Sequence, residues 1–472
     1  MKTIGFAAQL TAARLRMHQG AALLDSFAVI AFAAASLLTL TTFGGMWMFW
    51  QRMPSANHSI AQALDIPNST ISGIGETYVL LSCIAFGLLV VPLLSLGMDA
   101  ARLGAQGRVK RLASLRLIGM SAWRIQKLSL IETMVQYLIG FTIGFAIYLA
   151  TLPAWHLISF QGKHIGTFEM LLPWWGIFAT LFFLALLAAL STFLGLVRVS
   201  ISPLGVARRF SPRSLRWWRF GVLAAALAFA ITVFMSINAR YLANTRDTIL
   251  AIAAAMVLII VGVSVAGPLF IQLTARFGLL TKRAAKLLAA RRIIDDPRAA
   301  WRNVSAVSLI GLVTALVVSG GFISLEASNI TDNTMKTMAA LAKHDITIGI
   351  LIVFVFTLLL GAVSTLIQQA SDVFDRAPEQ RALINTGVPF GVFAAARLRQ
   401  VIWPYTVTTL LGVAVGILPG FSYRLMNNQQ IGSDMIILLV MVGLGTAITF
   451  AAAALTIPIE RQVLTVQSRR ND

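Results

Sequence analysis

Charged residues are scarce in this sequence. Only 12% of its 472 residues are Asp, Glu, Lys or Arg, whereas 58% are hydrophobic, and the mean hydropathy is +0.81. A soluble domain carries about 25% charged and roughly 45–50% apolar residues, so this chain has too little polar surface to face water on all sides. The composition excludes an ordinary soluble protein and predicts a polytopic, all-α membrane protein.

Acidic residues are scarcer than basic residues. The 18 Asp and Glu residues stand against 38 Lys and Arg residues, which gives a formal net charge of +20. In a soluble protein such an excess would suggest a nucleic-acid partner. Here the basic residues lie in short segments between apolar runs, where they orient helices in a membrane. We therefore predict membrane lipid, and no nucleic acid, as the surroundings of this chain.

Sequence patterns for catalysis, cofactors or metals are missing. The phosphate-binding loop Gly-x-x-x-x-Gly-Lys-Ser/Thr does not occur, and the glycine-rich stretch 104–110 has a different spacing. The five histidines form no pair at metal-ligand spacing, and metal or haem handling by His156 and His164 is the remaining alternative. The single cysteine, Cys83, excludes an intramolecular disulfide. We expect no catalytic, cofactor or metal residues in this chain; if ATP drives its function, ATP and Mg²⁺ must bind to a separate partner.

Long apolar runs are abundant. A membrane-spanning helix needs about 20 mainly apolar residues. If the N-terminus is cytoplasmic, the cytoplasmic segments hold 31 of the 38 Lys and Arg residues and the outer loops hold 7, an asymmetry that predicts a plasma-membrane protein with both termini in the cytoplasm. Ten spans are predicted: 22–49, 76–101, 127–153, 172–197, 220–237, 247–275, 303–324, 346–371, 401–423 and 434–457.

The chain also contains an internal repeat. Three alignments carry it: residues 12–14 with 289–291, residues 115–119 with 383–387, and Gly144 with Gly412. The offset is 277 for the first alignment and 268 for the other two, and the change falls in an outer loop, where length differences are tolerated. The repeat predicts two four-helix units joined by two extra helices, with boundaries at 1–209, 210–282 and 283–472.

The segment 108–127, between the second and third predicted spans, is basic and amphipathic. Leu112, Leu115, Ile118 and Ala122 fall at helical spacing, with Arg and Lys between them. Two interpretations fit this pattern. The stretch rests on anionic lipid headgroups, or it is a coupling helix that docks on a cytosolic partner. Composition alone does not separate the two.

The same segment and the helix after it resemble a known family. The string Leu-Arg-x-Ile-Gly at 115–119 is followed by Ser-x-x-x-Ile at 121–125, and the next span opens with Glu132 and carries Gly140-x-x-x-Gly144. This pattern resembles the FtsX/MacB-like ABC permease superfamily. The resemblance implies a four-helix unit that carries this loop and a cytosolic ABC ATPase that binds there.

The duplicated ten-helix layout is similar to that of the bacitracin-type resistance permeases. The resemblance covers roughly 1–209 and 283–470. The bacitracin-type permeases carry a large outer domain between spans 7 and 8, and MacB-like proteins carry one between spans 1 and 2. The corresponding loops here are only about 325–345 and 51–75. Peptide sensing through an outer domain is therefore not carried over.

The resemblance also implies roles for particular residues. Small-residue faces at Gly140, Gly144, Gly412 and Gly416 are expected to pack against neighbouring helices. The coupling loops are expected over 108–126 and its repeat counterpart 376–399. The residues expected to contact the ATPase are Arg111, Leu115, Arg116, Gly119, Trp123, Arg124, Leu383, Gly387 and Phe390.

The implied function is that of a non-enzymatic permease subunit of a bacterial ABC transporter. Two copies of a cytosolic ATPase would drive export or expulsion of an amphipathic or lipophilic substrate, such as an antimicrobial peptide or a lipid, and so support efflux and antimicrobial resistance. Two alternatives stay open: an ATP-driven signalling or mechanotransmission protein that controls a cell-wall enzyme or sensor kinase, and a secondary transporter without an ATPase. A small accessory membrane protein or a sensor kinase is a further partner to consider.

Overall fold

The structure is a computed structural model that describes residues 20–64, 74–106, 120–200, 217–238, 245–319, 333–426, 434–458 and 460. Almost all of these residues are helical, which confirms the predicted all-α class. The helices are α2 (Gly20–Arg52), α3 (Ala56–Leu64), α4 (Ile74–Gln106), α6 (Ala122–Thr151), α7 (Trp174–Ser200), α8 (Trp218–Asn238), α9 (Thr245–Phe277), α10 (Ala284–Asp295), α11 (Pro297–Ser319), α12 (Asn333–Asn385), α13 (Phe390–Met426) and α14 (Asp434–Ala454). The shorter elements are the 3-10 helices η2 (Leu152–Leu157) and η3 (Gly278–Leu280) and the strands β1 (Ser159–Phe160) and β2 (Lys163–His164).

Each of the ten predicted spans coincides with a long helix. Within the described residues, eight helices are long and apolar enough to cross a membrane; α4 and α11 are not among them. The described part of α4 contributes a shorter apolar stretch, Ile74–Gly87. Both helices, of 33 and 23 residues, nevertheless reach across a hydrocarbon layer of about 30 Å at 1.5 Å per residue. The chain is therefore a multi-pass membrane protein.

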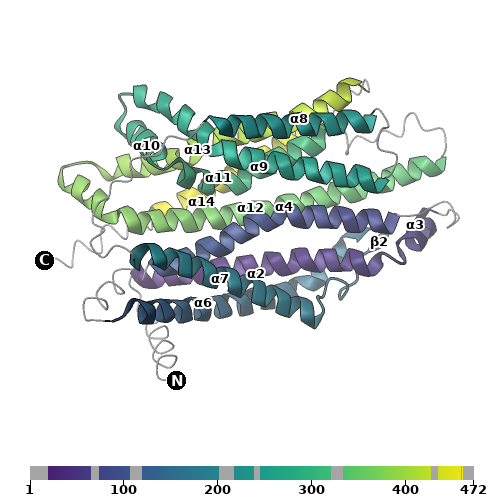
Figure 1. Ribbon diagram of the computed structural model, residues 1–472, viewed down its shortest axis with the longest axis horizontal. Coiled ribbons are helices and arrows are strands. Elements are labelled where there is room, and N and C mark those ends of the chain that lie inside the picture. The colour runs from purple at the N-terminus through teal and green to yellow at the C-terminus, as the bar shows by residue number, and fades with distance from the viewer. Residues whose placement is uncertain are drawn as a thin grey trace.

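The long helices run side by side, so the bundle has two ends (Figure 1). One end carries α3 and the hairpin β1–β2, and we call it the hairpin end. The other carries the start of α6 and the turn between α12 and α13, and we call it the coupling end. The loop predicted over about 325–345 is wrong in part, because residues 333–345 are the first turns of α12.

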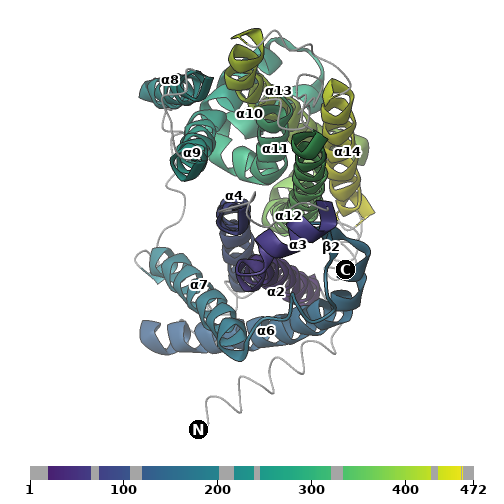
Figure 2. The same cartoon turned by 90° about the vertical axis from the view of Figure 1, so that its right-hand side faces the viewer.

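Two groups of four helices use the same contacts. In the first unit α2 packs on α4 and α6, and α7 packs on α4 and α6. In the second unit α11 packs on α12 and α13, and α14 packs on α12 and α13. The end-on view shows the first unit below the second, with α4 and α12 between them (Figure 2). The two units meet where α12 packs on α2 and α4.

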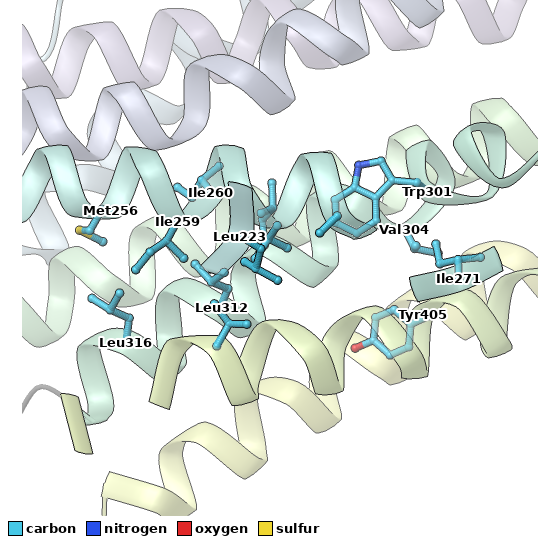
Figure 3. Close-up of a cluster of buried hydrophobic side chains, with 14 of the residues drawn as sticks. Leu223, Met256, Ile259, Ile260, Ile271, Trp301, Val304, Leu312, Leu316 and Tyr405 are labelled. Atoms are coloured by element: carbon cyan, nitrogen blue, oxygen red, sulfur yellow. The ribbon is translucent and has the colours of Figure 1, made fainter. Parts of the chain in front are cut away.

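The two extra helices lie against the second unit. Helix α8 packs on α9 and α13, and α9 also packs on α11 and on α4 of the first unit. The region 210–282, predicted as a linker, therefore adds to the wall of the second unit. Figure 3 shows the core that results, in which Trp301 of α11 lies near Ile271 of α9 and Tyr405 of α13. Trp301 fits because Gly267 has no side chain: a Cβ there would lie 2.3 Å from the indole ring.

Helix α12 is buried on two sides. Phe354 and Leu358 belong to the hydrophobic cluster of the second unit, whereas Leu360 and Ile367 belong to the cluster of the first. A surface helix has one apolar stripe, so burial on two sides indicates a central helix. Helix α12 therefore packs against both units at once.

Glycines bring two helix pairs into backbone contact. A Cβ atom on Gly144 of α6 would lie 2.4 Å from the carbonyl oxygen of Ala33 in α2. A Cβ atom on Gly416 of α13 would lie 2.4 Å from the carbonyl oxygen of Leu312 in α11. Such distances leave no room for a side chain. The geometry agrees with the packing role predicted for these glycines.

We call the contact of α6 with α2 and the contact of α13 with α11 the two glycine crossings. Their positions differ from the predicted repeat register by one helical turn. Gly140 contacts α2 in the way that Gly412 contacts α11, and Gly144 corresponds in the same way to Gly416. The alignment of Gly144 with Gly412 is therefore wrong for the helix contacts. The starts of α6 and α13 nevertheless keep the offset of 268. Both helices begin at equivalent places, and the second crosses its partner one turn later.

Candidate functional site

The start of α6 forms part of the coupling end. Four predicted coupling residues lie outside the described residues: Arg111, Leu115, Arg116 and Gly119. Ser121 occupies the N-cap of α6 in an extended conformation, and Trp123 and Arg124 after it are exposed. The ammonium group of Lys127 lies 5.1 Å from the centre of the Trp123 ring. This helix start presents an aromatic and basic surface.

The second predicted coupling loop, 376–399, is wrong as a loop. It consists of the end of α12, a tight turn and the start of α13. Gly387 has a φ of +92°, its N–H donates to the Ile384 carbonyl at 2.9 Å, and the Val388 N–H donates to the Leu383 carbonyl at 3.1 Å. This is the Schellman arrangement, in which a glycine with positive φ ends a helix. It brings Leu383, Gly387 and Phe390 together at one turn.

A buried ion pair lies behind this turn. Arg397 Nη2 lies 3.0 Å from Glu460 Oε1, and the two side chains are 4% and 0% exposed. Gln380 Nε2 donates to the same oxygen at 2.7 Å, and Arg397 Nη1 donates to the Gln369 carbonyl at 3.4 Å. Removing one partner of a buried pair is costly because the other charge stays buried. The pair therefore fixes α12, α13 and Glu460, which lies beyond the end of α14, relative to one another.

Helix α10 also contacts the end of α12, next to the coupling turn. Arg292 Nη2 lies 3.3 Å from Glu379 Oε1 near the end of α12. Arg292 is mostly buried, whereas Glu379 is 54% exposed, so solvent weakens this pair. Ala289, Ala290 and Ile293 of α10 are buried, and the helix packs on α9 and α13. The coupling turn is thus attached to the extra helices as well.

Arg52 organises the loop between α6 and α7 at the hairpin end. Its guanidinium donates to the carbonyls of Phe160 and His164 at 3.0 and 2.9 Å and pairs with the Glu169 carboxylate. The Gly166 N–H donates to the same carboxylate at 3.0 Å. Burial alone would raise the pKa of Glu169, but the hydrogen bond from Gly166 and the Arg52 charge outweigh it and hold the pKa below its ordinary value.

The tip of the hairpin reaches across to α12. Gln161 and Gly162 have φ angles of 58° and 72°, the pattern that two-residue hairpin turns favour. The Gln161 N–H donates to Asp345 Oδ2 of α12 at 2.9 Å. The Tyr78 hydroxyl of α4 donates to the same oxygen at 2.5 Å. We call Tyr78, Gln161 and Asp345 the latch, because they join the first unit to α12.

A cavity of about 530 Å³ lies between the two units, and Tyr78 and Asp345 form part of its wall. The wall comes from α2 and α4 of the first unit and from α9, α11 and α12 on the other side. Phe86, Ile260 and Phe356 are typical of the lining. Of the described lining residues, Asp345 alone is an acid or a base. The volume suits a drug-sized molecule.

Sequence reasoning missed the latch and the cavity. Tyr78 and Asp345 are 267 residues apart, so no local pattern links them. The signals that were present are a lone acid before the predicted span 346–371 and a Gln-Gly pair in a short loop. The rings of His156 and His164 lie 5.4 Å apart, but nowhere in the described ranges do three His, Cys, Asp or Glu residues come together as metal ligands.

Comparison with known proteins gives one family. Residues 100–204 match the family described as FtsX-like permease C-terminal. The match runs from the end of α4 through α6 to the residues after α7, and it includes the first predicted coupling loop and the first glycine crossing. No curated protein matches the chain. The chain therefore carries an FtsX-like permease domain on a bundle of long apolar helices, which supports a place in the FtsX/MacB-like superfamily of ABC transporter permeases.

Proposed function

We propose that this chain is the membrane-spanning subunit of an exporter that is driven by a separate cytosolic ATPase. Its substrate is amphipathic or lipophilic and passes through the cavity between the two four-helix units. The observation that carries the proposal is α12, which lines the cavity near one end and enters the coupling turn at the other. At 1.5 Å per residue its 53 residues span about 80 Å, so a push on the turn moves the cavity wall.

The ATPase would bind at the coupling end. Each unit offers a helix start there, Trp123 on α6 and Phe390 on α13, and two such places suit two ATPase copies. The units 1–209 and 283–472 are, in this proposal, two copies of one ancestral unit. The buried pair of Arg397 and Glu460 keeps the turn stiff, so that movement is transmitted rather than absorbed.

The lining supports a lipophilic substrate. The wall hydroxyls of Thr41, Thr42, Ser82 and Thr357 each donate to a carbonyl of their own helix, at 2.6 to 2.7 Å. The single proton of each of these four hydroxyls is therefore already used, so an acceptor group of a substrate buried beside them would find no donor there, at a cost of about 1–3 kcal/mol for each such group. The volume favours one acyl chain or a drug-sized molecule over a folded peptide.

The direction of transport is proposed from charge. The asymmetry of Lys and Arg supports a coupling end in the cytoplasm and a hairpin end outside. The latch then closes the outer side of the cavity in this conformation. ATP-driven rocking of the two units would open it and release the substrate outward.

The test is to fill the cavity. Gly349 of α12 lies in the cavity wall, and a Cβ there meets nothing within 4 Å, so Gly349→Phe places a ring in the cavity without a backbone clash. The control is Gly443→Phe on α14, where a Cβ also meets nothing but no cavity is filled. The probe is diphenylhexatriene, and the assay uses the chain purified with its native ATPase in lipid nanodiscs.

Two readouts decide the outcome. Energy transfer to the probe from Trp155, which lines the cavity, is isolated by subtracting the signal of the Trp155→Phe variant. ATP hydrolysis is measured with and without probe. Gly349→Phe should lose both the Trp155 signal and the stimulation of hydrolysis, and Gly443→Phe should keep both. Equal stimulation of the two variants would contradict the proposal that substrate passes through this cavity.

A further inference from the structure

The acid in the cavity wall has an unused oxygen. Asp345 is 3% exposed, and its Oδ2 accepts hydrogen bonds from Tyr78 and Gln161. Its Oδ1 is buried and has no hydrogen-bond partner among the described residues. A buried polar atom without a partner is costly and calls for an explanation. Here the atom belongs to Asp345, which is the one acidic side chain among the described residues of a mainly apolar cavity wall.

The neighbouring charges do not supply the missing partner. Arg52 and His344 lie near enough to act on Asp345 electrostatically. The guanidinium of Arg52 is held by Glu169 and by the hairpin carbonyls. The Nε2 atom of His344 lies 3.4 Å from the Ser159 hydroxyl. Neither group makes a hydrogen bond to Asp345 Oδ1.

The cavity thus combines a long apolar wall with an acid at its hairpin end. We propose that Asp345 is the site that recognises the headgroup of the substrate, and that the substrate is a drug-sized amphiphile with one cationic, hydrogen-bonding headgroup. This inference rests on the proposed function, because it names the substrate class of the same cavity. The apolar body lies along α2, α4, α9 and α12, and the cation meets Oδ1.

Complementarity of charge argues against other classes of amphiphile. An anionic headgroup would face the carboxylate, and like charges in an apolar surrounding repel strongly. A neutral chain without a donor would leave Oδ1 unpaired. A hydrogen bond between a cation and a carboxylate is about twice as strong as one between neutral groups. A cationic headgroup with an N–H donor therefore pairs this atom and matches the acid more strongly than a neutral donor does.

The experiment uses four probes with the same apolar body. These are diphenylhexatriene, its cationic trimethylammonium derivative, its anionic propionic acid derivative and a cationic primary-amine derivative. The primary amine supplies the hydrogen-bond donor that the trimethylammonium group lacks. Binding is measured in nanodiscs of neutral phosphatidylcholine by the energy transfer from Trp155, so that anionic lipid does not attract the cations. We expect the amine probe to bind at least about tenfold more tightly than the neutral probe, and the anionic probe to bind more weakly than the neutral one.

The decisive variant is Asp345→Asn. The Asn side-chain carbonyl still accepts the bonds from Tyr78 and Gln161, so the latch is kept while the charge is removed. We expect the preference for the cationic probes to fall to within about twofold of the neutral probe. The control is Glu76→Gln, which removes an exposed acid near the start of α4 that is not among the lining residues of the cavity. This variant should keep the cationic preference.

The outcomes are distinguishable. If Asp345→Asn retains the full cationic preference, Asp345 does not recognise the headgroup and the inference is overturned. If the neutral probe binds most tightly of all and Gly349→Phe still abolishes binding, the inference fails while the proposed function stands. If no probe gives a signal from Trp155, the cavity does not bind amphiphiles and the proposed function fails together with the inference.

Discussion

Arg52, the last residue of α2, forms an ion pair with Glu169, which stands 117 residues later, just before α7. The same guanidinium donates to two carbonyls of the hairpin loop, those of Phe160 and His164. One side chain therefore ties the end of α2 at the hairpin end to the segment that carries the latch. The guanidinium donates four hydrogen bonds, and the N–H of Gly166 donates a fifth to the same carboxylate.

This pair predicts a loss of stability in acid. The pKa of Glu169 is lower in the folded protein than its ordinary value of 4.5, so the pair stabilises fully above that value and loses its contribution as the pH falls through the lower folded pKa. Glu169→Gln should lower the melting temperature in detergent at pH 7, and the difference from the unaltered protein should shrink below about pH 4. The control Glu76→Gln should melt like the unaltered protein. A difference that does not change with pH would contradict the role of this charge.

The effect of a Gly→Ala substitution on stability should depend on whether the glycine lies in one of the two glycine crossings. Gly144→Ala and Gly416→Ala place a Cβ against a backbone carbonyl and should each lower stability by about 1–3 kcal/mol. Gly221→Ala and Gly443→Ala meet open space and should stabilise slightly, because alanine favours the helix by about 0.5–1 kcal/mol. The measurement is unfolding in mixed micelles. If all four variants behave alike, the close contacts do not form.

The two coupling surfaces should respond differently to salt. Phe390→Ala removes an apolar contact and should weaken ATPase binding by about 2 kcal/mol at low and high salt alike. Arg111→Ala combined with Arg116→Ala removes charge and should weaken binding chiefly at low salt, because salt screens exposed charges beyond about 8–10 Å. Leu410→Ala, on the exposed face of α13, is the control. Calorimetry across a salt series checks this, and the same salt dependence for both surfaces would remove the distinction.

The orientation of the bundle can be tested with an impermeant maleimide. In a Cys83→Ser background, single cysteines at the exposed positions His58 and Lys163 of the hairpin end should label from outside in intact cells. A cysteine at the exposed position Ala284 of the coupling end should label only after the cells are opened. The reverse result would place the hairpin end in the cytoplasm and invert the proposed direction of transport.

The parts of the structure that depend on local pattern could be predicted. Apolar runs predicted where the ten long helices lie. Gly387 was predicted only as an ATPase contact, and the structure shows that it is also the glycine with positive φ that ends α12. The contact role of Gly144 followed from its spacing to Gly140. The one-turn shift between the α6–α2 contact and the α13–α11 contact could not be predicted, because a shift of one turn keeps every glycine on the same face of its helix.

The latch could not be predicted, for a physical reason. Its bonds join residues from the hairpin, α4 and α12, and no helical period relates them. Gln161 is polar yet 1% exposed, and only the fold explains its burial, since the hairpin tip is held by Arg52 behind it. The length of α12 was also missed, because the polar turns at 333–345 read as a loop until they pack beside α3 and α4.

In the function proposed for this chain, transport is driven by ATP that another polypeptide hydrolyses. The most direct measurement is ATP hydrolysis by the chain purified alone and by the chain purified under mild conditions from its native membranes with whatever binds it. We predict background hydrolysis for the chain alone and a co-purified soluble ATPase with a phosphate-binding loop, whose hydrolysis rises in the complex and falls when Phe390→Ala is introduced. Robust hydrolysis by the chain alone, or native complexes that contain no ATPase, would contradict the account.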